Sequence, residues 1–202
     1  MNVTLDDRPL GILQPTLAHA LEAARRDAGG RGRVIVEALL DGRPLADRQL
    51  SAPDSEPRPA SELRFTSADP RALVRDGLRD AAEALDRVRD TQRRAAELLQ
   101  CGRVTEAIRE LPEVLSAWEA ARTMLADGCS LLSLDVDAIP SSDGAGRPGA
   151  RASSLGAHLR AATSAVGAQD WARLADLLAY DLDQEAERWR SLLESFARSL
   201  AA

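Results

Sequence analysis

The sequence predicts an α+β protein that is predominantly helical, with a small mixed domain over residues 1–68 and an antiparallel bundle of about four helices over residues 69–202. Long segments rich in alanine, leucine, glutamate and arginine favour helix. Segments before Pro70 are short and broken by turn residues, whereas those after it are long and carry apolar residues at helical spacing. The hydrophobic content of 45% is sufficient for a globular core.

The first 68 residues predict two hairpins around one helix. Asp41-Gly42 is a strong hairpin-turn signal, and it follows the most β-prone run of the chain, Val34–Val36. The order β-β-α-β-β resembles a small β-grasp, the ubiquitin-like arrangement. This resemblance concerns the order of the elements and implies no function. The expected elements are strands at residues 3–5 and 10–13, a helix from Pro15 and Thr16 to Gly29 and Gly30, and strands at residues 33–40 and 63–66.

A short sequence occurs twice in this domain. Leu-Asp-Asp-Arg-Pro-Leu at residues 5–10 is matched by Leu-Asp-Gly-Arg-Pro-Leu at residues 40–45. Both copies fall where hairpin turns are expected, and aspartate, glycine and proline are common turn residues. We interpret the repeat as turn chemistry used twice, and a duplicated binding loop is the alternative.

Two long helices are expected next, joined by a short turn that makes them antiparallel neighbours. Asp69 is a suitable N-cap before Pro70, and Cys101-Gly102 ends the first helix before Thr105 caps the second. Pro112 predicts a kink or a later start in the second helix. The inward residues are expected to be Val74, Leu78, Ala81, Leu85, Val88, Ala95 and Leu99 in the first helix, and Ile108, Leu111, Leu115, Trp118, Leu125 and Leu132 in the second.

Residues 135–153 are rich in glycine, proline and serine and predict a flexible loop. A shorter helix is expected after it, capped by Ser153 or Ser154, and Asp170 caps a last long helix. The inward residues are expected to be Leu155, Leu159, Ala162 and Val166 in the shorter helix, and Leu178, Leu182, Ala186, Trp189, Leu193, Phe196 and Leu200 in the last one.

The sequence argues against most enzyme classes. All 26 basic residues are arginine, so a P-loop or a Schiff-base lysine cannot be built. The Gly144–Gly149 glycine motif lies between helices rather than after a strand, and the Asp135-x-Asp137 pair lacks a closing glutamate for calcium. Cys101 and Cys129 have no zinc spacing, so both are expected to be core thiols. We therefore predict no catalytic, cofactor-binding or metal-binding residues.

The net charge of −6 disfavours nucleic-acid binding, because the arginines alternate with acidic residues along the helices. A signal peptide and an apolar run of about 20 residues are both missing from the sequence, which predicts a cytoplasmic protein with no membrane contact. The preference for arginine over lysine is typical of a GC-rich bacterial genome.

The predicted function is that of a non-enzymatic adaptor, chaperone or assembly factor that binds another protein, or a second copy of itself, through helical surfaces. Gln92 and Arg122 interrupt otherwise apolar helix faces, and such residues either specify a partner or lie at the edge of the core. Leu177 and Tyr180 are expected to form a small exposed apolar spot. These four residues are the candidate contacts. An enzyme with an Asp/Glu/Arg site between the domains and a structural subunit of a homo-oligomer are the alternatives.

Overall fold

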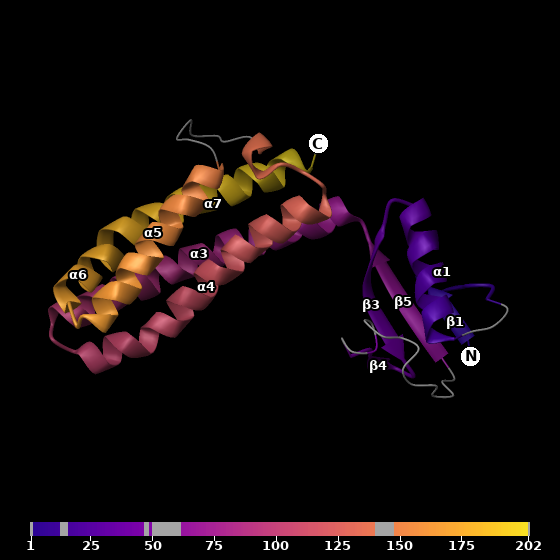
Figure 1. Ribbon diagram of the computed structural model, residues 1–202, viewed down its shortest axis with the longest axis horizontal. Coiled ribbons are helices and arrows are strands. Elements are labelled where there is room, and N and C mark those ends of the chain that lie inside the picture. Colours follow the sequence, from indigo (N-terminus) through magenta and orange to yellow (C-terminus); the bar gives the residue numbers. More distant parts are fainter. Residues whose placement is uncertain (1, 13–15, 47–48, 50–61, 140–147, 202) are drawn as a thin grey trace. The chain divides into compact units, whose positions relative to one another are not determined.

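The computed structural model describes residues 2–12, 16–46, 49, 62–139 and 148–201. The chain forms two compact units, Met1–Leu73 and Val74–Ala202 (Figure 1). The first contains a five-stranded mixed sheet and one long helix, and the second is helical. The prediction of an α+β fold that is predominantly helical is confirmed.

The sheet of the first unit has the strand order β2-β1-β5-β3-β4. The strands β1 and β5 run parallel at its centre, and the other neighbours are antiparallel. This arrangement agrees with the expected β-grasp-like order, with one more strand. The second strand begins earlier than expected, at Arg8. The elements are β1 (Asn2–Leu5), β2 (Arg8–Pro9), α1 (Leu17–Gly30), β3 (Val34–Leu40), β4 (Arg43–Pro44) and β5 (Glu62–Ala68).

One face of this sheet packs against α1. Burial alternates along β1 and β5, so that Val3, Leu5, Leu63 and Phe65 lie in one core cluster with the buried alanines and Leu21 of α1. Alternation of this kind follows from the two-residue period of a strand. Thr16 stands at the predicted start of α1 and caps it, because its hydroxyl accepts a hydrogen bond from the backbone N–H of His19 at 3.3 Å.

The repeated hexapeptide forms two hairpin turns of the same type. Asp6 and Asp7 have φ values of 51° and 60°, and Asp41 and Gly42 have φ values of 49° and 77°. Two successive residues with positive φ are typical of the two-residue type I′ hairpin. Each turn also binds β5 through its first aspartate: a carboxylate oxygen of Asp6 accepts from the Ser67 N–H at 2.8 Å, and that of Asp41 accepts from the Glu62 N–H at 2.8 Å. The repeat therefore fastens the two hairpins to opposite ends of β5.

Replacing Asp6 with alanine should lower the local stability of β5 by roughly 1–2 kcal/mol, because the carboxylate also accepts the Ser67 hydroxyl at 2.7 Å. These hydrogen bonds from Ser67 lower the pKa of Asp6 below its usual 3.8. A lowered pKa stabilises the fold above pH 3.8, and this stabilisation is lost as the pH falls through the lowered value. The difference between wild type and variant should therefore shrink in acid.

Amide hydrogen exchange at Ser67 is the suitable measurement, since the three tryptophans all lie in the second unit. Asp7→Ala is the matched control, because Asp7 occupies the same turn with a positive φ. Equal protection of Ser67 in the two variants at neutral pH would contradict the prediction.

The second unit contains four long helical segments. The first, α3, begins in the first unit, and Asp69 caps it by accepting from the Arg71 N–H at 2.8 Å. Every residue expected to face inward from α3 is buried. The elements are α3 (Pro70–Gln100), α4 (Val104–Leu131), the 3-10 turn η1 (Val136–Ala138), α5 (Pro148–Gly167), α6 (Trp171–Asp176), the π-helical turn η2 (Leu177–Asp181) and α7 (Leu182–Ser199).

The orientation of α4 differs from the prediction in its N-terminal half. Ile108 and Leu115 were expected to face inward, but they are 40% and 46% exposed. The buried line is instead Ala107, Val114, Trp118, Ala121, Leu125 and Gly128. The small residues in this line allow a close approach of the helix backbone, and the volume of Trp118 sets which side faces the core. The spacing of the large aliphatic residues alone therefore predicted the wrong face.

Two helix boundaries and the burial of one cysteine also differ from the prediction. The helix α4 begins at Val104, so Thr105 lies inside it, and Cys101 in the preceding turn is exposed rather than buried. The helix α5 begins at Pro148, before the serines expected to cap it. The reason is tertiary: Asp137 accepts a hydrogen bond from the Gly149 N–H at 3.0 Å and so caps this end. Residues 144–147 of the glycine motif lie outside the described residues.

The last predicted helix is divided by a π-helical turn. Asp170 caps α6 as expected, accepting from the Arg173 N–H at 3.1 Å. The turn η2 then connects α6 to α7 without leaving the helical conformation. All seven inward residues predicted between Leu178 and Leu200 are buried.

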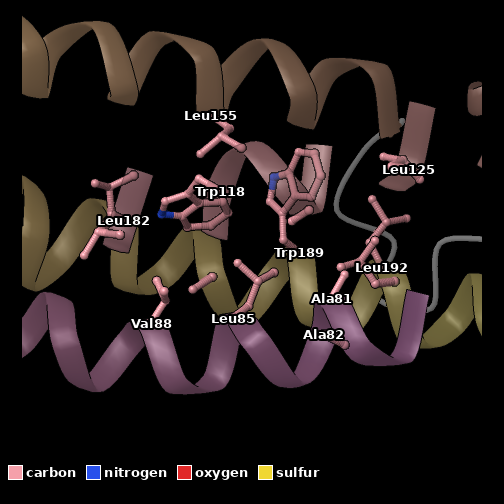
Figure 2. Packing of buried hydrophobic residues seen from close by; sticks show 14 of the residues in the cluster. Ala81, Ala82, Leu85, Val88, Trp118, Leu125, Leu155, Leu182, Trp189 and Leu192 are labelled. Atoms are coloured by element: carbon pink, nitrogen blue, oxygen red, sulfur yellow. The ribbon is translucent and has the colours of Figure 1, made fainter. Parts of the chain in front are cut away.

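The core of the second unit is centred on two tryptophans. Trp118 of α4 and Trp189 of α7 are both 0% exposed, and their rings meet edge to face with centroids 6.2 Å apart. Figure 2 shows both rings between Leu155 from α5 and the side chains of Leu85 and Val88 from α3. Four helices therefore contribute to one packed centre.

Ion pairs join α3 to α7 beside this core. Arg89 forms hydrogen bonds through two nitrogens to the two carboxylate oxygens of Asp183, each at 3.2 Å, and through a third to Glu187 at 2.6 Å. Burial raises the pKa of Asp183, but the hydrogen bonds from Arg89 and Arg93 outweigh this effect and lower the pKa overall. The arginines and carboxylates here are used in holding the helices together.

Candidate functional site

Gln92 is a core residue rather than a surface contact. Its side chain is 0% exposed, and its Oε1 accepts a hydrogen bond from Trp118 Nε1 at 3.1 Å. A buried indole N–H needs an acceptor, and Gln92 supplies it from the facing helix. The polar residue on the α3 face therefore serves as the buried hydrogen-bond acceptor of Trp118 and is not available to a partner protein.

Leu177 and Tyr180 do not form a shared exposed spot, which corrects the prediction. Leu177 is buried at 7% exposure, whereas Tyr180 is 68% exposed. Both residues lie in η2, where the i→i+5 hydrogen-bond pattern widens the helical turn and shifts the residues around the axis. This shift places Leu177 and Leu178 side by side in the core and leaves Tyr180 at the surface.

Arg122 is exposed and lines a pocket of about 580 Å³ at one end of the second unit. The walls come from the second half of α4, the turn leading into η1, the first turns of α5 and the ring of Trp189. Most of the lining is apolar, with Leu125, Leu134 and Val136 among its side chains. Arg122 forms no hydrogen bond or ion pair with any other described residue.

Two aspartates give the pocket its shape. Asp135 accepts from the Asp137 N–H at 3.0 Å and caps η1, and Asp137 in turn caps α5 through Gly149. Cys129 also lines the pocket; burial and, less strongly, the charge of Asp135 raise the pKa of its thiol. The expectation of a buried Cys129 is confirmed, and the Asp135-x-Asp137 pair is a capping device.

A separate apolar surface lies on the first half of α4. Ile108, Leu111 and Leu115 are three and four residues apart and so share one helix face. Ile108 and Leu115 are exposed, and Leu111 is partly buried at the edge of the core. We call these three residues the α4 stripe. Single exposed aliphatic residues are common, but an aligned set on one helix is a candidate contact surface.

A buried acidic residue was missed by the sequence analysis. Glu185 of α7 is 2% exposed, and its Oε1 accepts from the Ser154 hydroxyl and from an Arg188 nitrogen, each at 3.2 Å. Its spacing to Arg188 is the ordinary i,i+3 spacing of a surface pair, so the sequence contains no sign of its burial. The hydrogen bond to Ser154 connects α7 to α5, so the burial of Glu185 has a structural explanation.

Among the described residues, no group of three or more histidine, cysteine or acidic side chains is arranged to hold a metal ion. Within the same part of the chain, no helix is long and apolar enough to cross a membrane. Comparison of the chain with protein-family models, with curated proteins and with solved structures finds no match. The case for a function is therefore made from the residues of the chain itself.

Proposed function

We propose that the protein is a non-enzymatic adaptor that binds the amphipathic helix of a partner protein on the α4 stripe. The observation that carries the proposal is the exposure of Ile108 and Leu115, at 40% and 46%, on one face of a helix whose opposite face is fully packed. Amphipathic helices bind other proteins through residues at i, i+3, i+4 and i+7, and the stripe offers the i, i+3 and i+7 positions of this set.

The stripe can supply the binding energy of a modest interface. Complete burial of a leucine or isoleucine side chain contributes about 1.5–3 kcal/mol relative to full exposure, and these two side chains retain somewhat less than half of their exposed surface. Two such anchors, with Leu111 between them, would fit a partner helix of two to three turns.

The charges around the stripe indicate the chemistry of the partner. The segment Val104–Glu119 contains four glutamates and a single arginine. Glu106 and Glu110 pair with Arg103 and Arg94, whereas Glu113 and Glu119 form no salt bridge with a described residue. A partner helix with lysine or arginine beside its apolar face would complement this charge and would be selected over an acidic one.

The test is the double variant Ile108→Ser, Leu115→Ser, compared with wild type in affinity capture from the native cells. We expect the variant to lose a binding partner that contains a basic amphipathic helix and to remain folded, because both side chains are exposed. Leu131→Ser is the matched control, since Leu131 is 42% exposed on the same helix but lies outside the stripe.

Two results would count against the proposal. One is that the double variant retains every protein that wild type retains. The other is that light scattering finds a wild-type dimer which the double variant converts to a monomer, because the stripe would then bind a second copy of the chain. The enzyme and homo-oligomer alternatives stay predictions.

A further inference from the structure

We propose that the pocket beside Arg122 is a binding site for a small organic anion, a carboxylate attached to an aliphatic or aromatic body. This inference goes beyond the adaptor function and uses other residues, because the pocket is formed by the second half of α4, whereas the α4 stripe is on the first half. An experiment on the pocket therefore does not test the α4 stripe, and an experiment on the stripe does not test the pocket.

The size and lining of the pocket suit an apolar body. Its volume of about 580 Å³ lies within the range of small-molecule sites. Leu125 and the ring of Trp189 form its inner wall, and Leu134, which is 44% exposed, borders it. Figure 2 shows the ring of Trp189 between Trp118 and Leu125. An apolar ligand would cover Leu134 and remove its surface from water.

Arg122 indicates a negative head group. Among the described residues that line the pocket, Arg122 is the one cationic side chain, and it has no hydrogen-bond or ion-pair partner in that part of the chain. A guanidinium binds a carboxylate through two parallel hydrogen bonds, an arrangement that favours this anion over a neutral oxygen. Other surface arginines of this unit, such as Arg109 and Arg173, also form no ion pair with a described residue, whereas Arg89 and Arg190 do. The position of Arg122 at the pocket, rather than its lack of a partner, is therefore what distinguishes it.

Two acidic residues also line the pocket and oppose an anion. Asp135 already accepts the Asp137 N–H through one carboxylate oxygen, so part of its charge is taken up in capping η1. Glu119 is one helical turn before Arg122 on α4 and forms no salt bridge with a described residue. Glu119 should therefore weaken anion binding, and its replacement by glutamine should strengthen it.

The indole of Trp189 contributes an apolar ring to the pocket. Its Nε1 is buried and has no hydrogen-bond partner among the described residues, unlike the indole of Trp118. An unpaired buried donor is costly, at about 1–3 kcal/mol. In Figure 2 the indole nitrogen of Trp189 lies on the side of Trp118 and the rest of the ring lies on the side of Leu125, so the pocket meets the ring rather than the N–H.

The first experiment compares three probes with the same chain: decanoate, decanol and decylamine. Binding is measured by calorimetry on the full chain. We expect decanoate to bind about tenfold more tightly than decanol, and decylamine to bind most weakly. Arg122→Gln should remove the difference between decanoate and decanol, and Glu119→Gln should increase the affinity for decanoate.

The second experiment places the ligand in the pocket. In a Cys101→Ser background, Cys129 is the one remaining thiol of the chain, and its raised pKa makes it slow to alkylate. Decanoate should slow the reaction of Cys129 with iodoacetamide further, because the thiol lines the pocket. Ala126→Trp should fill the pocket and abolish decanoate binding. Ala120→Trp, an exposed position of the same helix outside the lining, is the matched control.

Several outcomes would overturn the proposal. Equal binding of decanoate and decanol, unchanged by Arg122→Gln, would show that the arginine does not select the head group. Tighter binding of decylamine than of decanoate would show that the negative charges of Glu119 and Asp135 dominate the electrostatic potential of the pocket. Failure of all three probes to bind the folded wild-type chain, or unchanged alkylation of Cys129 at saturating decanoate, would show that the pocket is not the site.

Discussion

Replacing Trp118 with alanine is expected to lower the free energy of unfolding by about 4 kcal/mol, the largest effect of any single substitution proposed for this chain. The side chain is 0% exposed and meets Trp189 edge to face, so its removal leaves a cavity where α3, α4, α5 and α7 come together. The substitution also leaves Gln92 Oε1 buried without its donor. Urea denaturation followed by far-ultraviolet circular dichroism measures the change.

A double-mutant cycle separates the hydrogen bond from the packing. Trp118→Phe keeps most of the ring but removes the donor, and Gln92→Leu removes the acceptor at similar volume. The two together should be less destabilising than the sum of the single effects, by about 1–2 kcal/mol, because each single variant leaves one buried polar atom unpaired. Strict additivity would show that the bond contributes nothing to stability.

Replacing Gly128 with alanine should lower the free energy of unfolding by about 2 kcal/mol, although alanine is the better helix former. A Cβ at this position would lie 2.8 Å from Cγ1 of Val74, on the facing helix α3. Valine is β-branched and stiff at χ1 in a helix, so the contact can be relieved only by moving the helices apart. Thermal unfolding and urea denaturation measure the loss.

Gly77→Ala is the matched control on the facing helix. A Cβ there would lie 2.5 Å from Sδ and 3.1 Å from Cε of Met124, which are at the far end of a flexible side chain. Methionine can move to another rotamer, so the gain in helix propensity of about 1 kcal/mol should be retained in large part. Similar destabilisation by both substitutions would mean that the approach of α3 and α4 does not depend on Gly128.

The helix α3 and the apolar residues expected on its inward face could be predicted because two independent signals agree in the sequence. Asp69 and Pro70 mark its start, and large apolar residues recur at helical spacing from Val74 to Leu99. The same reasoning succeeded for α7, where Leu182, Trp189 and Phe196 are buried. In both helices, most of the large apolar residues face inward, and Leu73 of α3, at 43% exposure, is an exception.

The spacing of large apolar residues did not predict the inward face of the N-terminal half of α4. Its inward line includes alanine and glycine, and these carry little weight in a periodicity of large apolar residues. Ile108 and Leu115 followed the helical period but lie on the outer side, which makes them candidates for a contact surface instead of core residues. The adaptor proposal thus rests on two residues that the sequence analysis placed inside.

Gln92 and Arg122 were singled out because each is a polar residue on an otherwise apolar helix face. The structure gives a different cause for each. Gln92 interrupts the α3 face because Trp118 requires a buried acceptor. Arg122 interrupts the expected α4 face because Ala121 is the inward residue at that turn, which leaves Arg122 exposed beside the pocket. The two residues look alike in the sequence, since a pattern of one helix contains no information about the facing one.

The sequence by itself determined the fold class, the hairpin turns at Asp6 and Asp41, and the large apolar residues that are buried in α3 and α7. These features depend on local propensity, turn chemistry and the spacing of large apolar residues, which act within a few turns of chain. The tertiary structure alone decided which side of α4 faces out, that Asp137 starts α5 at Pro148, and that Arg122 borders a pocket. These depend on close packing between segments distant in sequence, where a small residue such as Gly128 can set the approach of two helices.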